Sequence, residues 1–173
     1  MNYWIITDTH FGHDKIIEYC KRPPNFENLI LRNITKVVKE SDLLIHLGDV
    51  CFGKDEFWHN ELRKINCKKW LVRGNHDSKS LAWYLSQGWD FVADTFSLDI
   101  FGGEILFSHI PVKDTGYFLN IHGHFHNTDF HTHEPELALL LTRKHVLLVM
   151  ENNNYQPFNL KTIVEKYKIT GTN

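Results

Sequence analysis

The chain has 173 residues, of which 42% are hydrophobic and 23% charged, and its formal net charge is -2. This composition supports a globular core and excludes a disordered, fibrous or membrane-spanning chain. The near-neutral charge provides no general attraction to nucleic acid or to an anionic membrane. The 12 histidines are the unusual count. They indicate either metal and acid–base chemistry or a surface that is rich in histidine without a function.

The first half of the chain alternates short apolar runs with segments of helical periodicity. Such alternation is typical of βαβ units. Strands are predicted at residues 3–7, 43–47 and 70–72, and helices at residues 13–20, 28–39, 54–65 and 81–86.

The second half has mostly strand patterns joined by turns, which we interpret as a β meander. Strands are predicted at residues 91–92, 96–101, 104–108, 118–122 and 146–150, and a closing helix at residues 160–167. The polar run at residues 151–154 is interpreted as a turn. No repeat or linker divides the chain, so we expect one α/β domain over residues 1–173 with more than one sheet.

Polar side chains follow five of the predicted strands, where ligand sites form in α/β sheets. The five segments are Asp8-Thr9-His10, Gly48-Asp49, Gly74-Asn75-His76-Asp77, Ser108-His109 and Gly123-His124-Phe125-His126. Residues two positions apart in extended chain face the same way, so each D-x-H or H-x-H pair can point into one site. Oxygen and imidazole groups without thiolate suit manganese, iron, nickel or zinc.

The ordered set D-x-H, G-D, G-N-H-D, H and G-H-x-H resembles the calcineurin-like metallophosphoesterases, and it runs from Asp8 to His126. The segments Thr-Asp-Thr-His-Phe-Gly-His, Val-Arg-Gly-Asn-His-Asp and Asn-Asn-Tyr-Gln-Pro resemble more specifically the small single-domain phosphoesterases of bacteria and their phages. The resemblance implies a four-layer α-β-β-α sandwich with two mixed β-sheets.

The resemblance also implies two divalent metal ions, with manganese as the first candidate and iron, nickel or zinc as alternatives. One ion would be held by Asp8, His10, Asp49 and His126, and the other by Asp49, Asn75, His109 and His124. A hydroxide between the ions would attack phosphorus, and His76 would act as the general acid.

Three neighbouring residues have two interpretations each. Asp77 either orients His76 or caps the helix that follows. His13 either contacts a substrate phosphate or begins a helix and faces solvent. Arg73 either pairs with a substrate phosphate or forms a structural ion pair.

The leading functional hypothesis is a phosphoesterase acting on a small phosphodiester or nucleotide, because the chain leaves little room for a separate specificity domain. A nuclease acting on short RNA or DNA is the alternative, although the neutral charge argues against extended nucleic-acid binding. A non-catalytic metal-binding scaffold ranks below both, because the motif residues are all present.

Partners and location follow from smaller signals. The longest apolar run near the end of the chain, residues 137–141, is too short to cross a membrane. Cys20, Cys51 and Cys67 are odd in number and lack C-x-x-C spacing, which favours reduced thiols and a cytoplasmic location. Trp83 or Trp89 can contribute to a homodimer, or they can belong to the core.

Overall fold

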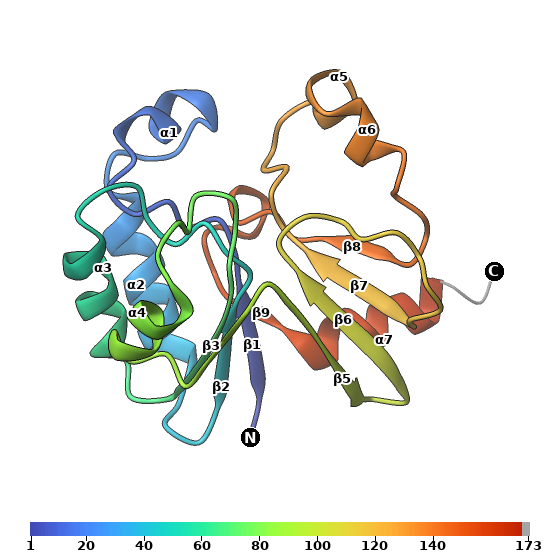
Figure 1. Cartoon of the computed structure of the whole chain (residues 1–173), viewed down its shortest axis with the longest axis horizontal. Coiled ribbons are helices and arrows are strands. Elements are labelled where there is room, and N and C mark those ends of the chain that lie inside the picture. Colours follow the sequence, from blue (N-terminus) through green and yellow to red (C-terminus); the bar gives the residue numbers. More distant parts are fainter. Residues whose placement is uncertain (171–173) are drawn as a thin grey trace.

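The computed structural model describes residues 1–170 and contains two β-sheets packed face to face (Figure 1). The first sheet has the order β4-β3-β2-β1-β9. Its four parallel strands are β1 (Tyr3–Ile6), β2 (Leu43–His46), β3 (Lys68–Val72) and β4 (Phe91–Ala93), and β9 (Phe158–Asn159) pairs antiparallel with β1. The central strands are nearly continuous apolar runs because both faces of the sheet are covered.

Three helices cover the outer face of the first sheet, namely α2 (Phe26–Val37), α3 (Asp55–Arg63) and α4 (Leu81–Ser86). The short helix α1 (Asp14–Tyr19) lies beyond the carboxyl ends of the strands (Figure 1). In α2 the fully buried residues Phe26, Ile30 and Ile34 recur at helical spacing and join the core on this side of the sheet. The α4 helix begins after Ser80, whose side chain accepts a hydrogen bond from the backbone amide of Trp83 at 3.2 Å.

The second sheet has the order β5-β6-β7-β8, and the predicted β meander is wrong here. Its strands are β5 (Thr95–Ile100), β6 (Gly103–Ser108), β7 (Leu119–His122) and β8 (His145–Leu147). Only β5 and β6 form an antiparallel hairpin, whereas β6, β7 and β8 run parallel. Residues 109–118 and 123–144 carry the chain back to the starting edge of the sheet, which a parallel strand requires. The alternation of apolar residues along a strand does not show whether the strand will pair parallel or antiparallel with its neighbour.

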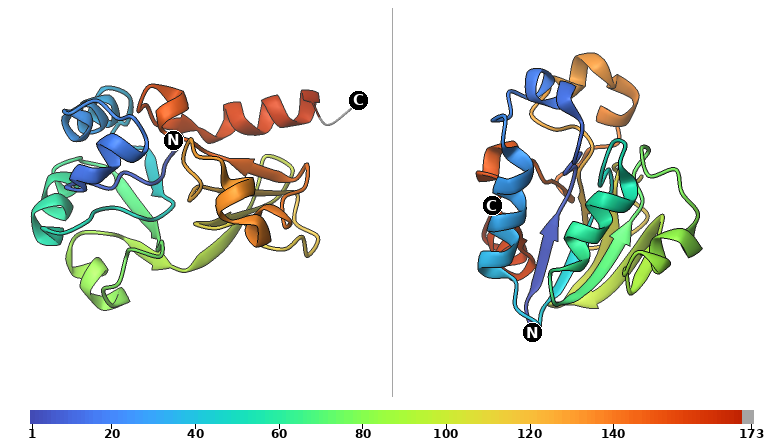
Figure 2. Two further views of the ribbon diagram at one scale, coloured as in Figure 1. Left: turned by 90° about the horizontal axis from the view of Figure 1, so that it is seen from above. Right: turned by 90° about the vertical axis from the view of Figure 1, so that its left-hand side faces the viewer.

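The core between the sheets explains how they are held together. Ile5 and Ile45 of the first sheet share one buried cluster with Phe107 and Ile121 of the second. The α7 helix (Leu160–Thr170) adds Leu160 and Val164 to the same cluster and packs against β1 and β9. Figure 2 shows α7 running along one side of both sheets. Two mixed sheets with helices confirm the predicted α/β fold.

Three short elements were not predicted: α5 (Phe130–His133), α6 (Pro135–Ala138) and β9. They are too short to show a periodicity, and tertiary contacts position them instead. The ring of Phe130, for example, stacks on that of Phe125 at 4.4 Å, which fixes α5 near the end of β7. The predicted turn at residues 151–154 is a 3-10 turn, η1 (Glu151–Asn153), followed by Asn154 in the left-handed conformation.

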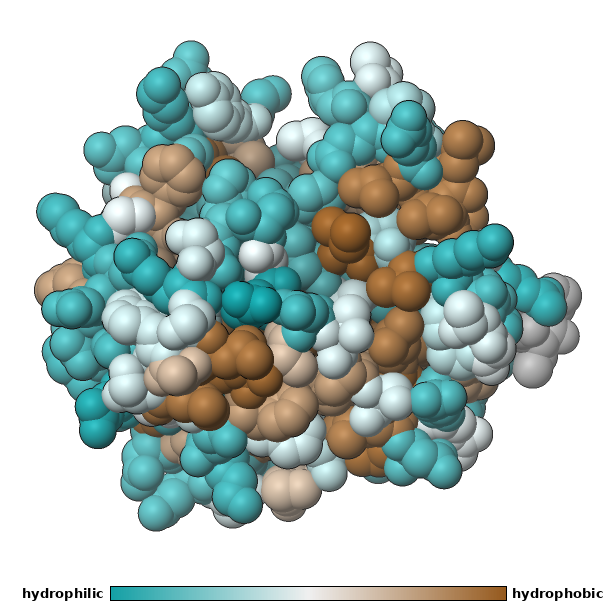
Figure 3. Space-filling model, viewed as in Figure 1, coloured by the Kyte–Doolittle hydropathy of each residue, from teal (hydrophilic) through white to brown (hydrophobic). Residues whose placement is uncertain are grey.

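The surface bears on the predicted partners. Trp89 is buried and Trp83 packs against the core behind α4, so the core-packing interpretation holds for both. Apolar residues are exposed elsewhere: Figure 3 shows them gathered over α6 and the second sheet, where Leu139 is 85% exposed. Among the described residues, no helix has both the length and the apolar character needed to span a bilayer.

Candidate metal centre

The carboxyl ends of β1, β2, β3, β6 and β7 meet at one edge of the two sheets. Figure 1 shows α1 on one side of this edge and α5 with α6 on the other. The chain leaves the strands through sharp turns, and five predicted ligands have a left-handed backbone, with φ values from 46° to 76°: Asp8, His10, Asp49, His124 and His126. This conformation is rare in residues other than glycine, and it clusters where a structure imposes a functional geometry.

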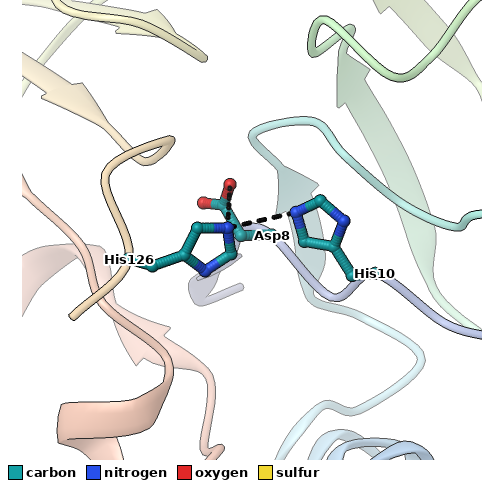
Figure 4. Close-up of side chains that lie close together, drawn as sticks. All are labelled: Asp8, His10 and His126. Carbon is teal, nitrogen blue, oxygen red and sulfur yellow. Dashed lines mark hydrogen bonds and ion pairs between the residues drawn. The ribbon is translucent and has the colours of Figure 1, made fainter. Parts of the chain in front are cut away.

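The first group of side chains contains Asp8, His10 and His126, which point toward one another (Figure 4). The Nε2 atoms of His10 and His126 lie 3.1 Å apart, and Nε2 of His126 is 3.7 Å from Oδ1 of Asp8. Nε2 of His10 is also 3.5 Å from Oδ2 of Asp49. Oδ1 of Asp8 is buried and has no hydrogen-bond partner. A buried carboxylate oxygen aimed at two imidazole nitrogens fits a bound cation.

The second group gathers around Nε2 of His109. This atom lies 2.9 Å from Oδ1 of Asn75, 3.2 Å from Nδ1 of His124 and 3.4 Å from Oδ2 of Asp49. Oδ2 of Asp49 therefore faces both groups. The structure thus brings all seven predicted ligands together at one edge of the two sheets.

Hydrogen bonds on the far side of the imidazole rings determine which nitrogens face the centre. Nδ1 of His109 lies 2.7 Å from the Leu47 carbonyl oxygen, which can only accept a hydrogen bond, so Nδ1 carries the proton. Nε2 of His124 lies 2.7 Å from Oε2 of Glu134 in the same manner. When both rings are neutral, the lone pairs of His109 Nε2 and His124 Nδ1 face each other, and His109 Nε2 also faces the oxygens of Asn75 and Asp49. Acceptors that converge in this way fit a divalent cation.

The electrostatics of the centre agree with this fit. Burial alone would lower the pKa of His109, but the hydrogen bond and charge of Asp49, together with Asp8, raise it to about 9. Burial would also lower the pKa of His126, but the charge of Asp8 and the hydrogen bond with Glu151 outweigh it and raise this pKa to about 10. The centre thus has a negative potential that stabilises positive charge. A divalent cation is stabilised by the same potential and would displace these protons.

Two glycines are required here by space rather than by backbone conformation. A Cβ atom on Gly74 would overlap Oδ1 and the backbone nitrogen of Asp49, and one on Gly123 would overlap Oδ2 of Asp8 and Oγ1 of Thr7. The carboxylates of Asp8 and Asp49 therefore lie directly against the backbone of neighbouring loops. The backbone amide of His124 uses this closeness and donates a hydrogen bond to Asp8 Oδ2 at 3.0 Å, which links the two sheets.

His76 lies at the rim of the centre, where 42% of its side chain is exposed. Its backbone amide donates to Oδ1 of Asp49 at 2.9 Å, and its Nε2 is 3.9 Å from Oδ2 of the same residue. A histidine in this position can reach both solvent and a group bound at the centre, as a general acid must.

Asp77 follows neither of its two predicted interpretations. Its Oδ2 accepts hydrogen bonds from the backbone amides of Asp49 at 2.7 Å and Gly74 at 2.8 Å, and its Oδ1 accepts from Val50 at 3.2 Å. The carboxylate therefore holds two ligand loops together instead of orienting the His76 ring, and Ser80 caps the following helix. Burial raises the pKa of Asp77 to about 6, against the hydrogen bond from Gly74.

The two residues predicted to bind substrate differ in position. The ring of His13 lies beside the centre, 5.7 Å from the ring of His10. Arg73 directs Nε and Nη2 to Asp94 at 2.9 and 2.6 Å, so the structure shows the ion pair that was the alternative interpretation.

The sequence interpretation missed Arg22 and Glu151, which support the centre from behind. Arg22 is buried and donates to the carbonyl oxygens of Asp8 at 2.7 Å and Thr9 at 2.8 Å. It also donates to Oε1 of Glu151 at 2.6 Å, and that oxygen is 3.3 Å from Nδ1 of His126. The signal available was weak, namely a single arginine beside Pro23-Pro24 and one glutamate in a polar turn.

Comparisons with known proteins agree with the geometry. The family model of the calcineurin-like phosphoesterases matches residues 1–170. An uncharacterized protein of Methanocaldococcus jannaschii is 31% identical over 184 residues, which cover 98% of this chain and 94% of that protein. A protein of unknown function from Aquifex aeolicus has a similar crystal structure, with a TM-score of 0.76 and 28% identity over 95% of this chain and 98% of the other. The chain therefore belongs to the calcineurin-like phosphoesterase family and is a metal-binding phosphoric ester hydrolase.

Proposed function

We propose that the chain hydrolyses a small phosphodiester or nucleotide at a binuclear metal centre made by Asp8, His10, Asp49, Asn75, His109, His124 and His126. The observation that carries the proposal is the convergence of acceptors on two adjacent points that share Oδ2 of Asp49. Divalent ions there would polarise the phosphoryl oxygens and activate water at neutral pH. Manganese is the ion we expect first, since the oxygen and imidazole ligand set suits it.

The residues of the chain have distinct tasks in this proposal. Asp49 holds both ions and, through its Oδ1, the backbone of His76. His76 then donates a proton to the leaving oxygen, for which its exposed position at the rim is suited. Two divalent ions and the two aspartates leave the centre positive, so that it attracts a phosphate anion.

The test is metal-dependent hydrolysis of bis-p-nitrophenyl phosphate by the wild type and by Asp49→Asn, His76→Ala and His131→Ala variants. We expect Asp49→Asn to lose bound manganese and activity together, and His76→Ala to lose activity while retaining the metal. His131 is an exposed histidine on α5, and its variant is the matched control. Wild-type protein that binds two ions but hydrolyses no phosphoester would overturn the proposal.

Three further expectations accompany this function. A single domain over residues 1–173 and a cytoplasmic location follow from the composition and the cysteine pattern. A homodimer is the third, and the exposed apolar surface around Leu139 supports it. Light scattering of the purified protein measures the oligomeric state directly.

A further inference from the structure

One side of the rim is aromatic. The ring of Phe52 contacts that of His13 edge-on at 4.4 Å and lies 5.5 Å from the ring of His76. Phe52 is nevertheless 49% exposed, and Tyr19, whose ring is 6.4 Å from that of His13, is 63% exposed. Apolar ring surface therefore faces solvent directly beside the residue that we propose donates the proton.

The position of Phe52 is fixed by the backbone. Its amide donates to the carbonyl of Phe11 at 2.9 Å, and the amide of Phe11 donates to the carbonyl of Val50 at 3.0 Å. Phe11 is fully buried and stacks on Trp58 at 5.1 Å, so this part of the loop is anchored in the core. The exposed ring is thus held in place before a ligand arrives, which lowers the entropic cost of binding against it.

The two basic residues that flank His76 most closely in the sequence, Arg73 and Lys79, are each paired with an aspartate. Arg73 is bound to Asp94, and Lys79 is 3.4 Å from Asp55. The loop that carries His76 therefore offers no free cation from Arg73 or Lys79 for an additional phosphate.

We propose that the substrate is a nucleoside phosphoester whose base stacks on Phe52 while its phosphate binds at the centre. The inference rests on the proposed function and specifies its substrate class. The ring of His76 lies 5.5 Å from the ring of His10 and 5.5 Å from that of Phe52. A leaving group that His76 protonates is therefore within reach of Phe52, and a sugar can connect a phosphate at the ligands with a base on that ring. Stacking suits any base because each has a flat π face.

The binding experiment compares two ligands that differ only in the base. Manganese-loaded protein is titrated by calorimetry with adenosine 5′-monothiophosphate and with ribose 5-monothiophosphate, which both hydrolyse slowly. We expect the adenosine compound to bind about tenfold more tightly, as one base–aromatic stack provides. The ratio is expected to fall to near one in Phe52→Ala and in Phe52→Leu, which keeps an apolar side chain without a flat ring. Phe52→Trp is expected to retain it.

Phe57→Ala is the matched control. Phe57 is 52% exposed on α3, and its ring lies against that of Trp58 rather than at the rim. We expect this variant to keep the wild-type ratio of affinities. A wild-type ratio near one, or a ratio that persists in Phe52→Ala, would overturn the proposal.

A turnover measurement distinguishes this proposal from the proposed function. The substrates are adenosine 2′,3′-cyclic phosphate and methyl ribofuranoside 2,3-cyclic phosphate, which have the same leaving oxygens. Equal kcat/KM values on the two would overturn the stacking proposal while the phosphoesterase function stands. Selective binding of the adenosine ligand without hydrolysis of any phosphoester would instead overturn the function and leave the stacking site intact.

Discussion

The carboxylate of Asp77 accepts a hydrogen bond from the backbone amide of Asp49 at 2.7 Å, so the residue that faces both ligand groups is held by its main chain as well as its side chain. The same carboxylate binds the amides of Gly74 and Val50. One buried side chain therefore sets the distance between the loops that follow β2 and β3.

Replacing Asp77 with asparagine tests this support. The amide group offers one oxygen where the carboxylate offers two, so at least one backbone amide loses its acceptor. We expect manganese affinity to fall about 10- to 100-fold and the free energy of unfolding to fall by about 1–3 kcal/mol. Asp42→Asn is the control, because buried Asp42 accepts from the backbone amides of Asn2 and Lys39 at the other end of β2. It should lower stability without changing metal affinity, and an equal loss of affinity in both variants would contradict the assignment.

The Arg22–Glu151 pair leads to a second prediction. Both side chains are buried, so Arg22→Met leaves Glu151 with only its contact to His126 and the carbonyls of Asp8 and Thr9 without this donor. We expect the free energy of unfolding to fall by about 3–5 kcal/mol. The double variant Arg22→Met, Glu151→Gln should recover part of that loss because the buried carboxylate that has lost its arginine is then neutral. Urea unfolding of the four proteins in the cycle measures the coupling, and additive effects of the two substitutions would argue against it.

Glu134 is expected to act through His124. Its contact with Nε2 of His124 at 2.7 Å keeps the proton on that nitrogen and leaves Nδ1 free to bind metal. Glu134→Ala should weaken manganese binding about 10- to 100-fold, whereas Glu136→Ala, an exposed residue on α6, should leave it unchanged. Competition with a fluorescent chelator gives both affinities. Wild-type affinity in Glu134→Ala would show that the ring is oriented by other contacts.

Outside the centre, the buried residue His59 leads to a prediction of how the stability of the fold changes at acidic pH. Burial lowers the pKa of His59 to about 4, and its Nδ1 accepts a hydrogen bond from Nε1 of Trp89 at 2.9 Å. Because this pKa lies below that of the unfolded chain, the unfolded state binds more protons between pH 6.5 and 4, and stability falls as the pH falls through that range. Relative to neutral pH, this difference in proton binding at His59 lowers the free energy of unfolding by about 3 kcal/mol at pH 4.

The measurement is a set of urea unfolding curves between pH 7 and pH 4 for the wild type and His59→Gln. Glutamine does not titrate, and its carbonyl oxygen can still accept from Trp89. We expect the variant to lose stability less steeply than the wild type as the medium becomes acidic. Parallel pH profiles would mean that His59 is solvated or already charged in the folded protein.

How far the sequence predicted the protein depends on how local each signal is. The ligands Asp8, Asp49 and His109 each lie within three residues of the end of a strand, so strand prediction and the rule that strand ends meet at one edge were enough to group them. Arg22 could not be found in this way, because its partner Glu151 is 129 positions away and the pairing depends on the finished fold. The parallel direction of β7 also depends on the path of a loop, on which apolar periodicity carries no information.

The contact between Arg22 and Glu151 affects when, during synthesis, the protein becomes able to bind metal. During synthesis the first ligands, Asp8 and His10, leave the ribosome long before the turn that contains Glu151. Until that turn is synthesised, Arg22 cannot pair with Glu151. The Asp8 and Thr9 carbonyls, to which Arg22 donates, are then held less firmly. Metal loading should therefore be a late event that follows translation of the turn containing Glu151. Contacts that span so much of the chain are also the ones that slow folding.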